Sequence, residues 1–232
     1  MFDAWSSLSQ KGVPVDDLGT IMRQRKSIRA FKSDPVPKET IGEILKLSIL
    51  APSSINLQPS EFHVVMGGEK ERLIRRLLKA YRERQVSCGP GTGKPLPRAF
   101  AKRGARTLEG MKPYFEEMKA EPSRFINEGS CQFYGAPVAV LLFRDDSFSK
   151  GSLVDIGISL GYFVLAAHSA GLGTCPIGLI NAYADEVKDL LNIPENKNLV
   201  VGVALGYPDW ESPINHFKSS REPLDQFVRW LE

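Results

Sequence analysis

Two almost uninterrupted apolar runs constrain the fold more than any other feature of this chain. They are APVAVLLF at 136–143 and NLVVGVALG at 198–206. Each run has the length of a strand, and apolar residues at nearly every position are typical of a strand that is buried on both faces. Helices on both sides of a sheet are the usual cover for such strands. We therefore expect both runs to be central strands of a sheet that lies between helices.

The rest of the chain carries few strand signals and many helix signals. The pattern predicts one more strand at 62–66, helices at about 16–24, 37–51, 69–84, 106–120, 153–170 and 183–191, and a final amphipathic segment at 223–232. That order indicates an α+β protein of the three-layer α/β/α kind. Neither an internal repeat nor a linker divides the chain, so we expect residues 1–232 to form a single domain.

Charge and cysteine usage limit the classes of partner and compartment. The 30 Lys and Arg and 27 Asp and Glu residues give a net charge of +3, which is small for a protein that neutralises many phosphates, so we expect no nucleic-acid partner. Three cysteines without a CxxC pair form neither a disulfide framework nor a structural zinc site, which indicates a reducing compartment. The apolar stretch at 153–172 contains Asp155 and His168, so we expect a core helix and no membrane span. With no signal-peptide pattern at the N-terminus, we expect a cytoplasmic protein.

Two short motifs suggest other chemistry, but their context does not support it. GISLG at 157–161 matches the nucleophile elbow of serine hydrolases, with Ser159 as the nucleophile and His216 downstream. The elbow needs a strand before the serine, whereas 153–170 is predicted to be one continuous helix. GPGTGK at 89–94 lacks the first Gly and the final Ser or Thr of a phosphate-binding P-loop. We therefore expect neither a hydrolase nor a P-loop enzyme.

A basic cluster, RQRKSIRAF at 23–31, follows the first predicted helix. An extended backbone places Arg25, Ser27 and Arg29 on one side and Lys26 and Ile28 on the other. Two guanidinium groups and a hydroxyl on one side can hold a phosphate. The alternative is a helix end whose cations favour the helix dipole. The spacing alone leaves both interpretations open.

Two further segments favour a small-molecule site. APSSINLQP at 51–59 is polar between apolar elements, and its hydroxyl, amide and backbone groups suit the edge of a flat heterocycle rich in amides. Its other interpretation is a loop held by its own hydrogen bonds. GLGTCPIGL at 171–179 is predicted to be a Gly-rich turn, in which small residues let a backbone N–H approach a ligand closely.

Taken together, these segments resemble the FMN-dependent nitroreductase family. The resemblance covers nearly the whole chain and rests on five segments in order, at 23–31, 51–59, 133–143, 155–179 and 219–228. It implies the nitroreductase fold, with a mixed, mostly antiparallel central sheet flanked by helices. It also implies an entwined homodimer with the flavin at the subunit interface. Residues 82–130 match least well, and we expect them to form a lid or insertion that sets acceptor preference.

The resemblance also assigns cofactor-binding residues. It implies that Arg25, Ser27 and Arg221 hold the FMN phosphate, and that Arg29 lies near the pyrimidine edge of the isoalloxazine with Lys26 nearby. Residues on two loops would line the two sides of the ring: Pro52, Ser53, Ser54 and Asn56 on one, and Pro176, Ile177 and Gly178 on the other. No side-chain acid or base is required, so no catalytic residue is assigned, and no metal site is expected.

The activity that follows is an FMN-dependent oxidoreductase. Hydride would pass from NADPH or NADH, bound transiently, through flavin N5 to a nitroaromatic, a quinone or a similar small oxidised acceptor. The sequence does not choose between the two donors. Within the fold, the alternatives are a reductive dehalogenase like the iodotyrosine deiodinases or an enzyme that consumes its own flavin. Outside it, the alternatives are the serine hydrolase and a nucleic-acid binder that uses the 23–29 cluster.

Overall fold

A four-stranded sheet forms the centre of the molecule. The computed structural model describes residues 18–89 and 94–232. Its strands are β1 (Glu61–Met66), β2 (Val138–Asp145), β3 (Gly173–Ile177) and β4 (Lys197–Gly206), in the order β1-β2-β4-β3. The three pairings among these strands are antiparallel. A parallel bridge between Ser27 and Thr174 adds the basic segment to the β3 edge.

The two central strands are buried on both faces, as the apolar runs predicted. Along β2, Ala139, Leu141 and Phe143 belong to one hydrophobic core, whereas the alternating residues, Val138, Val140 and Leu142, belong to a second core. All six side chains are buried. The alternation of side chains across a strand therefore divides the interior into two cores, one on each face of the sheet.

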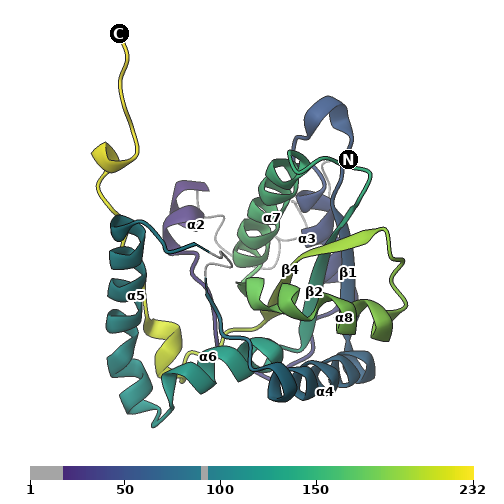
Figure 1. Ribbon diagram of the computed structural model, residues 1–232, viewed down its shortest axis with the longest axis horizontal. Helices are drawn as coiled ribbons and strands as arrows, with labels where there is room; N and C mark the ends of the chain where they lie inside the picture. The colour runs from purple at the N-terminus through teal and green to yellow at the C-terminus, as the bar shows by residue number, and fades with distance from the viewer. Residues whose placement is uncertain (1–17, 90–93) are drawn as a thin grey trace.

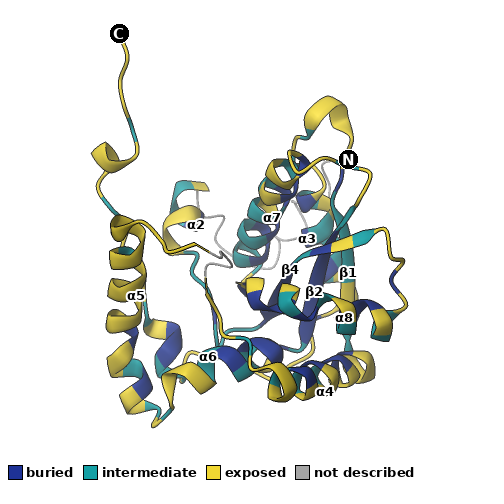
Figure 2. Cartoon of the chain, viewed as in Figure 1, coloured by how far each residue is buried: buried dark blue, intermediate teal, exposed yellow. Residues whose placement is uncertain are grey.

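Helices cover both faces and complete a three-layer architecture (Figure 1). One core contains α3 (Lys38–Ser48) and α7 (Ser152–Ser169), and α2 (Leu18–Gln24) packs against α7. The other core contains α4 (Gly67–Arg84), the end of α6 (Pro122–Cys131) and α8 (Ala184–Leu191). Figure 2 shows that the buried residues concentrate on the sheet and on the inner faces of these helices. The three-layer prediction is confirmed.

α5 (Arg98–Glu117) lies outside these layers. It packs through Met111 and Phe115 against Ile214, in the short 3-10 helix Pro213–His216, and forms a small third core there. Most of its surface is exposed (Figure 2). The region 82–130 thus consists of the last turn of α4, a connecting segment, α5 and α6.

Several individual elements differ from what the sequence predicted. α5 begins at Arg98, eight residues earlier than predicted, and α6 was not predicted. The segment 171–179 contains the strand β3 rather than only a turn. The helix predicted at 37–51 ends earlier, at Ser48, and Ile49 is its exposed C-cap. The C-terminal segment runs away from the body of the chain (Figure 1), and Leu231 is 94% exposed.

α7 is apolar on its exposed side as well as on its buried side. In the described part of the chain it is the one helix that is long and apolar enough to cross a membrane, which core helices of soluble proteins also are. Ile156, Phe163 and Ala167 pack into the core beside the sheet. Leu153 and Val154 are exposed. α7 is therefore a core helix that also carries an uncovered apolar face.

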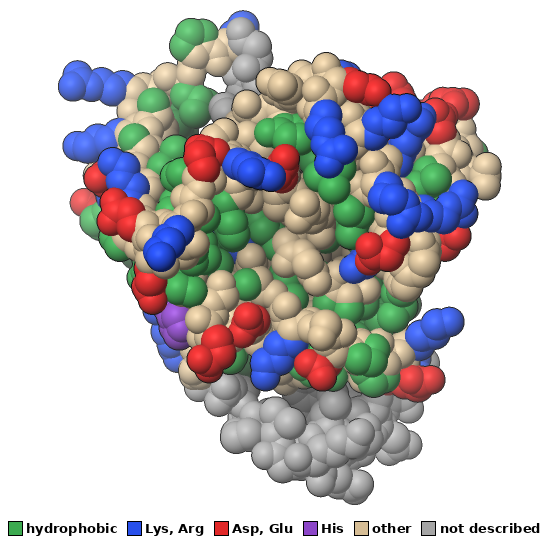
Figure 3. Space-filling model, turned by 90° about the horizontal axis from the view of Figure 1, so that it is seen from below, with side chains coloured by type: hydrophobic (Ala, Val, Ile, Leu, Met, Phe, Trp, Pro, Cys, Tyr) green, Lys and Arg blue, Asp and Glu red, His purple; other side chains and the backbone are tan. Residues whose placement is uncertain are grey.

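The basic helix α4 is a solvated surface with paired charges. Arg72 pairs with Glu69 at 2.8 Å, and Arg84 pairs with Glu186 at 2.6 Å. The face seen from below in Figure 3 shows basic and acidic side chains interspersed rather than a continuous basic field. The charges of α4 therefore need no partner from outside the chain.

Candidate functional site

The basic segment 25–31 is extended and fixed by backbone hydrogen bonds. The Ile28 N–H donates to the Thr174 carbonyl at 2.9 Å, and the Arg29 N–H donates to Asn215 Oδ1 at 2.8 Å. Ile28 is buried. A Cβ on Gly173 would lie 2.6 Å from the Ile28 side chain, so only glycine leaves room for Ile28 there. The extended alternation then turns Ser27 and Arg29 away from the side that holds Ile28. Arg25 lies where α2 ends, since its N–H still donates to the Ile21 carbonyl at 2.9 Å.

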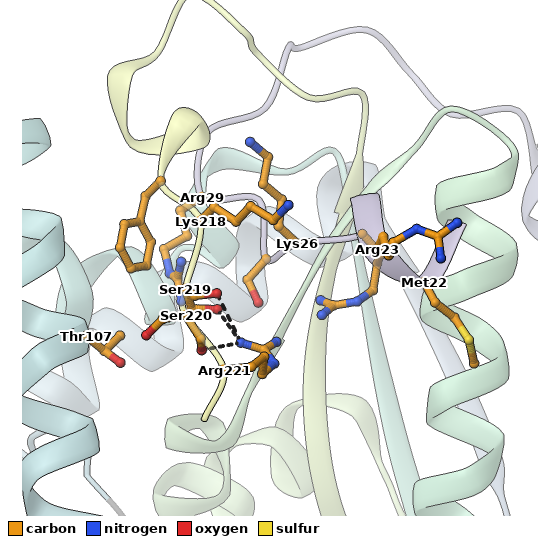
Figure 4. A pocket seen from close by; sticks show the side chains of 12 residues that line it. Met22, Arg23, Lys26, Arg29, Thr107, Lys218, Ser219, Ser220 and Arg221 are labelled. Atoms are coloured by element: carbon orange, nitrogen blue, oxygen red, sulfur yellow. Dashed lines mark hydrogen bonds between the residues drawn. The ribbon is translucent and has the colours of Figure 1, made fainter. Parts of the chain in front are cut away.

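A cavity of about 680 Å³ opens beside this segment (Figure 4). Its walls come from the end of α2 and the basic segment, from α5 and from the segment after the last long strand. The lining residues are Met22, Arg23, Arg25, Lys26, Ser27, Arg29, Thr107, Phe217, Lys218, Ser219, Ser220 and Arg221. Six of these are cations and none is an acid. The fold thus assembles a cationic basin from segments nearly 200 residues apart in the sequence.

Arg25 and Arg221 form the first cation pair in this basin. Burial, and then the charge of Arg221, lower the pKa of Arg25. One terminal nitrogen of Arg221 donates to Ser219 Oγ at 2.8 Å and to the Ser220 carbonyl at 3.0 Å (Figure 4). The guanidinium is therefore held by its own loop while its charge faces another cation. Bringing two like charges together favours an anion between them.

Lys26 and Lys218 form a second pair. Burial, and then the charge of Lys218, lower the pKa of Lys26. The Lys26 ammonium lies 4.9 Å from the centre of the Trp210 ring. Sequence reasoning missed Lys218. The only signal for it was the basic spacing KSSR at 218–221, close to Arg221 but far along the chain from the first cluster.

Arg29 lines the basin and also a second, more open cavity of about 650 Å³. Gln132 and Tyr134 line that second cavity too. Burial raises the pKa of Tyr134 to about 12, while the charge of Arg29 opposes the shift. Tyr134 has a left-handed φ of 52°, and its ring fills the space that a Cβ on Gly129 would need, at 2.8 Å. Arg29 is thus positioned beside a rigid aromatic wall.

The loop 52–56 is held by its own hydrogen bonds, as its second interpretation predicted. Ser53 Oγ accepts from the Gln58 N–H at 2.9 Å, and the Ser54 N–H donates to Asp155 Oδ2 at 3.3 Å. Pro52, Ser54 and Asn56 are nevertheless exposed. Ile55 has a φ of 42° and is 88% exposed. A self-supporting loop therefore presents its side chains outward.

Within one chain this loop and the basic segment lie at opposite ends of α7. Asp155, which contacts the loop, is in the first turn of α7, whereas Thr174, which bridges to Ser27, follows its last turn. The fifteen residues from Asp155 to Ser169 span about 20 Å of helix. None of the residues 52–56 lines the basin. A single chain does not bring the two groups of predicted residues together.

The third predicted group lies on the β3 edge. Pro176 and Gly178 are exposed, and Ile177 is buried. β3 pairs only with β4 among the named strands, so Pro176 occupies an edge strand, where its missing N–H costs no ladder hydrogen bond. These residues do not line the basin. They share the β3 edge with the Ser27–Thr174 bridge.

The hydrolase motif is structural. Ser159 lies in the middle of α7, is buried, and donates its hydroxyl to the Ser48 carbonyl at 3.1 Å. His216 Nε2 makes its hydrogen bond with the Trp210 carbonyl at 2.8 Å. The described residues contain no group of three or more His, Cys, Asp or Glu side chains that could hold a metal ion. The basin therefore remains the candidate functional site.

The arrangement of the basin fits FMN at its phosphate end. A phosphate monoester carries a charge of about −1.5 to −2. Arg25 and Arg221 supply two guanidinium groups whose mutual repulsion such a group would relieve, and Ser27 supplies a hydroxyl in the same basin. Cavities of this size are typical of small-molecule and cofactor sites.

Comparisons with known proteins agree with this geometry. The sequence profile described as "Nitroreductase family" matches residues 22–207. The chain is 28% identical over 218 residues to a 4-nitrobenzoate reductase of Pseudomonas putida, covering 93% of this chain and 96% of that protein. It is 30% identical over 216 residues to Nitroreductase NfnB of Mycolicibacterium smegmatis, covering 90% and 91%.

Solved structures show the same fold. The crystal structure of the FMN-dependent nitroreductase NfnB from Mycobacterium smegmatis in complex with NADPH superposes with a TM-score of 0.83 at 28% identity, over 92% of this chain and 97% of that one. A more distant likeness is to an iodotyrosine deiodinase bound to FMN and 3-iodo-L-tyrosine, with a TM-score of 0.61 at 26% identity, over 93% and 99%.

Proposed function

Because the chain belongs to the nitroreductase family, it is an FMN-dependent oxidoreductase that uses NAD(P)H, and we propose that it reduces nitroaromatic compounds at a flavin site built by two copies of the chain. The observation that carries the proposal is the basin with six cations and no acid beside the extended segment 25–29. When bound, FMN supplies the hydride chemistry between donor and acceptor. The chain's own residues bind it, orient it and shield it from water.

Arg25, Ser27 and Arg221 hold the phosphate in this proposal. The side of the segment that faces away from Ile28 presents Ser27, Arg25 precedes it at the end of α2, and the Ser219–Ser220 loop fixes Arg221 opposite them. Arg29, further along the same side, places a permanent positive charge where the pyrimidine edge of the flavin would carry negative charge after reduction. Its position beside the wall of Tyr134 supports that role.

The ring is lined from two directions in this proposal. Pro176, Ile177 and Gly178 approach it from the β3 edge of the same chain. Pro52, Ser53, Ser54 and Asn56 approach it from the second copy, since they lie about 20 Å from the basic segment of their own chain. A homodimer therefore completes each site.

Exposed apolar side chains support the dimer. They gather near the loop 52–56, at the first turn of α7 and along the C-terminal segment; the residues are Ile49, Leu50, Ile55, Leu57, Leu153, Val154, Leu224, Phe227, Trp230 and Leu231. A monomer that keeps so many large apolar groups in water loses the free energy of their burial. A two-fold dimer covers the same patches on both copies.

We further propose that residues 1–232 form one domain in which 82–130 is the lid that selects the acceptor. Thr107 of α5 already lines the basin, and Phe217 fills the space beside Gly110 of the same helix. The protein would act in the cytoplasm, where its three cysteines, Cys88, Cys131 and Cys175, stay reduced, as the structure has them.

Absorption spectroscopy of the purified protein tests the proposal. We expect a flavin band that bleaches when NADPH or NADH is added without oxygen, and that returns when 4-nitrobenzoate is added. A protein that binds no FMN from solution would refute the function. Reoxidation by 3-iodo-L-tyrosine with release of iodide, and not by nitroaromatics, would favour the dehalogenase alternative that the deiodinase likeness suggests.

A further inference from the structure

The basin holds more positive charge than the flavin phosphate needs. Its six cations face a phosphate of about −2. The acid nearest to them along the chain, Glu222, turns away and pairs with Arg106 at 2.9 Å and with Arg103 at 3.8 Å on α5. The surplus is therefore not neutralised by acids that line the cavity. Unneutralised cations held together are costly unless a further anion binds.

The cations of the basin form two separate pairs rather than one ring. The first pair is Arg25 with Arg221, and the second is Lys26 with Lys218. Arg25 still donates its N–H to the Ile21 carbonyl at the end of α2, whereas Lys26 begins the extended segment, and each of the two faces a different cation. Figure 4 shows Lys26 and Lys218 at the same end of the cavity, away from Arg221. The two pairs therefore present their charges at different places in the cavity.

Contacts with neighbouring side chains position the second pair, Lys26 and Lys218. The Lys26 ammonium lies over the exposed Trp210 ring at 4.9 Å, and this contact fixes a long side chain that would otherwise move freely. Trp210 is in turn held near His216, whose ring Nε2–H donates a hydrogen bond to the Trp210 carbonyl. Lys218 is exposed at the mouth of the cavity. The pair thus faces a ligand that arrives from solvent.

We propose that Lys26 and Lys218 form a second anion site that binds the 2′-phosphate of NADPH. This inference rests on the proposed function, because the donor must approach a flavin held in the same basin. NADPH and NADH differ only in that phosphate. A site for it at the mouth of the basin makes the protein discriminate in favour of NADPH, a preference that the sequence left open.

The test compares the two donors in the same enzyme preparation. The second-order rate constant for anaerobic flavin bleaching is measured by stopped flow with NADPH and with NADH, and their ratio is taken for the wild type, Lys218→Gln, Lys26→Gln and the double variant. The ratio is normalised to flavin content. We expect the ratio to fall by about 10- to 100-fold in Lys218→Gln, the range for a lost charge-assisted hydrogen bond. The double variant should lose less than the product of the two single effects, because the pair acts on one phosphate.

Lys79→Gln is the matched control. Lys79 is an exposed lysine on α4, remote from the basin, and the substitution makes the same change in net charge. We expect its donor ratio to equal that of the wild type. On the wild type, adenosine 2′,5′-bisphosphate should compete with NADPH more strongly than ADP does, and rising salt should lower the NADPH rate more than the NADH rate.

Three outcomes would overturn the inference. An unchanged ratio in Lys218→Gln and Lys26→Gln would do so directly. Loss of FMN in both variants without a change in ratio would place the pair in the flavin phosphate site. A selective loss of activity on 4-nitrobenzoate relative to nitrobenzene would place the acceptor carboxylate there. A wild type that binds no FMN would instead refute the proposed function, so the two failures are distinguishable.

Discussion

The cationic basin and the loop 52–56 are both polar, but they direct their polar groups in opposite ways. The basin turns its charges inward around a cavity and leaves them without acidic partners. In the loop, backbone N–H groups donate hydrogen bonds to the side chains of Ser53 and Asp155, and the other side chains face solvent. Polar groups that face a cavity can bind a small ligand inside the chain. A loop that faces solvent and carries an exposed apolar tip can instead contact the surface of another chain.

This difference between the basin and the loop indicates which part of the proposed flavin site one chain can form by itself. In the proposed site, the phosphate end can form as soon as one chain folds, because the Ser27–Thr174 bridge and the Arg29–Asn215 hydrogen bond fix the basic segment within the chain. In the same proposal, the ring end forms only when two chains associate. Binding of FMN and turnover should therefore respond differently to substitutions in the two regions.

The strongest test of this division uses mixed dimers. Arg25→Ala and the double variant Ser53→Ala/Asn56→Ala are each expected to be nearly inactive as homodimers. If the two regions act on one flavin from different chains, a mixed dimer contains one site with both defects and one intact site. Mixed dimers purified away from both homodimers should then show about half of the wild-type activity, since one of their two sites is intact.

The measurement is nitroaromatic turnover by dimers that carry two different affinity tags and are purified on both. If the regions acted on one flavin from the same chain, every site in a mixed dimer would carry one defect. Activity no higher than that of the parent homodimers would then refute the division of the site between chains.

Arg25→Ala should also weaken FMN binding by about 10- to 100-fold, because it removes a charge-assisted hydrogen bond and one cation of the first pair. Fluorescence titration of the protein with FMN measures the effect. Arg23→Ala is the control: Arg23 lines the same basin, but it is exposed and donates a hydrogen bond to Thr20 Oγ1 at 3.3 Å. Equal losses in both variants would mean that the overall field of the basin, and not the pair, holds the phosphate.

The central architecture could be predicted from the sequence because burial leaves a strong pattern. Continuous apolar runs identified β2 and β4, and helical periodicity identified α3, α4 and α7. β3 was missed because Gly173 and Pro176 disfavour strands, and both are tolerated there for reasons that lie outside the segment. Gly173 makes room for Ile28, and Pro176 lies on an edge.

The site was predicted in part for the same reason. The cluster at Arg25–Arg29 is local and visible in the sequence. Lys218 joins Lys26 only through the fold, and the separation of residues 52–56 from the basin is a property of the length of α7. The composition of two segments does not predict the distance between them in the fold.

Gly173→Ala should damage the basin and spare the loop. The new Cβ would overlap Ile28 at 2.6 Å, and overpacking of this kind costs about 1–3 kcal/mol in the free energy of unfolding. Movement of Ile28 displaces the neighbouring residues of the basic segment, so we also expect weaker FMN binding. Urea denaturation and FMN titration measure the two effects.

Gly42→Ala is the matched control on the other side of the molecule. A Cβ on Gly42, in α3, meets nothing within 4 Å, so the same substitution should stabilise the helix by about 0.5–1 kcal/mol and leave FMN binding unchanged. A loss of FMN affinity in Gly42→Ala, or none in Gly173→Ala, would contradict the dependence of the basin on the Ile28 contact.

The smallest expected effect concerns strain in the loop. Ile55 is a β-branched residue with a φ of 42° and an 88% exposed side chain, a combination that costs about 1–2 kcal/mol and gains nothing from packing within the chain. Ile55→Asn should raise the free energy of unfolding by about 0.5–1 kcal/mol in the dissociated chain, because asparagine tolerates left-handed backbone. In the dimer, the same variant should lower nitroaromatic turnover, since the apolar tip is then lost from the partner's flavin site. Ile49→Asn, at a nearby exposed isoleucine with an ordinary φ of −75°, should bring no gain in stability. If Ile55→Asn gained stability without any loss of turnover, the strained backbone of the loop would have no role in the assembled site. The loop 52–56 and the basin would then have no reason to be treated as parts of one flavin site.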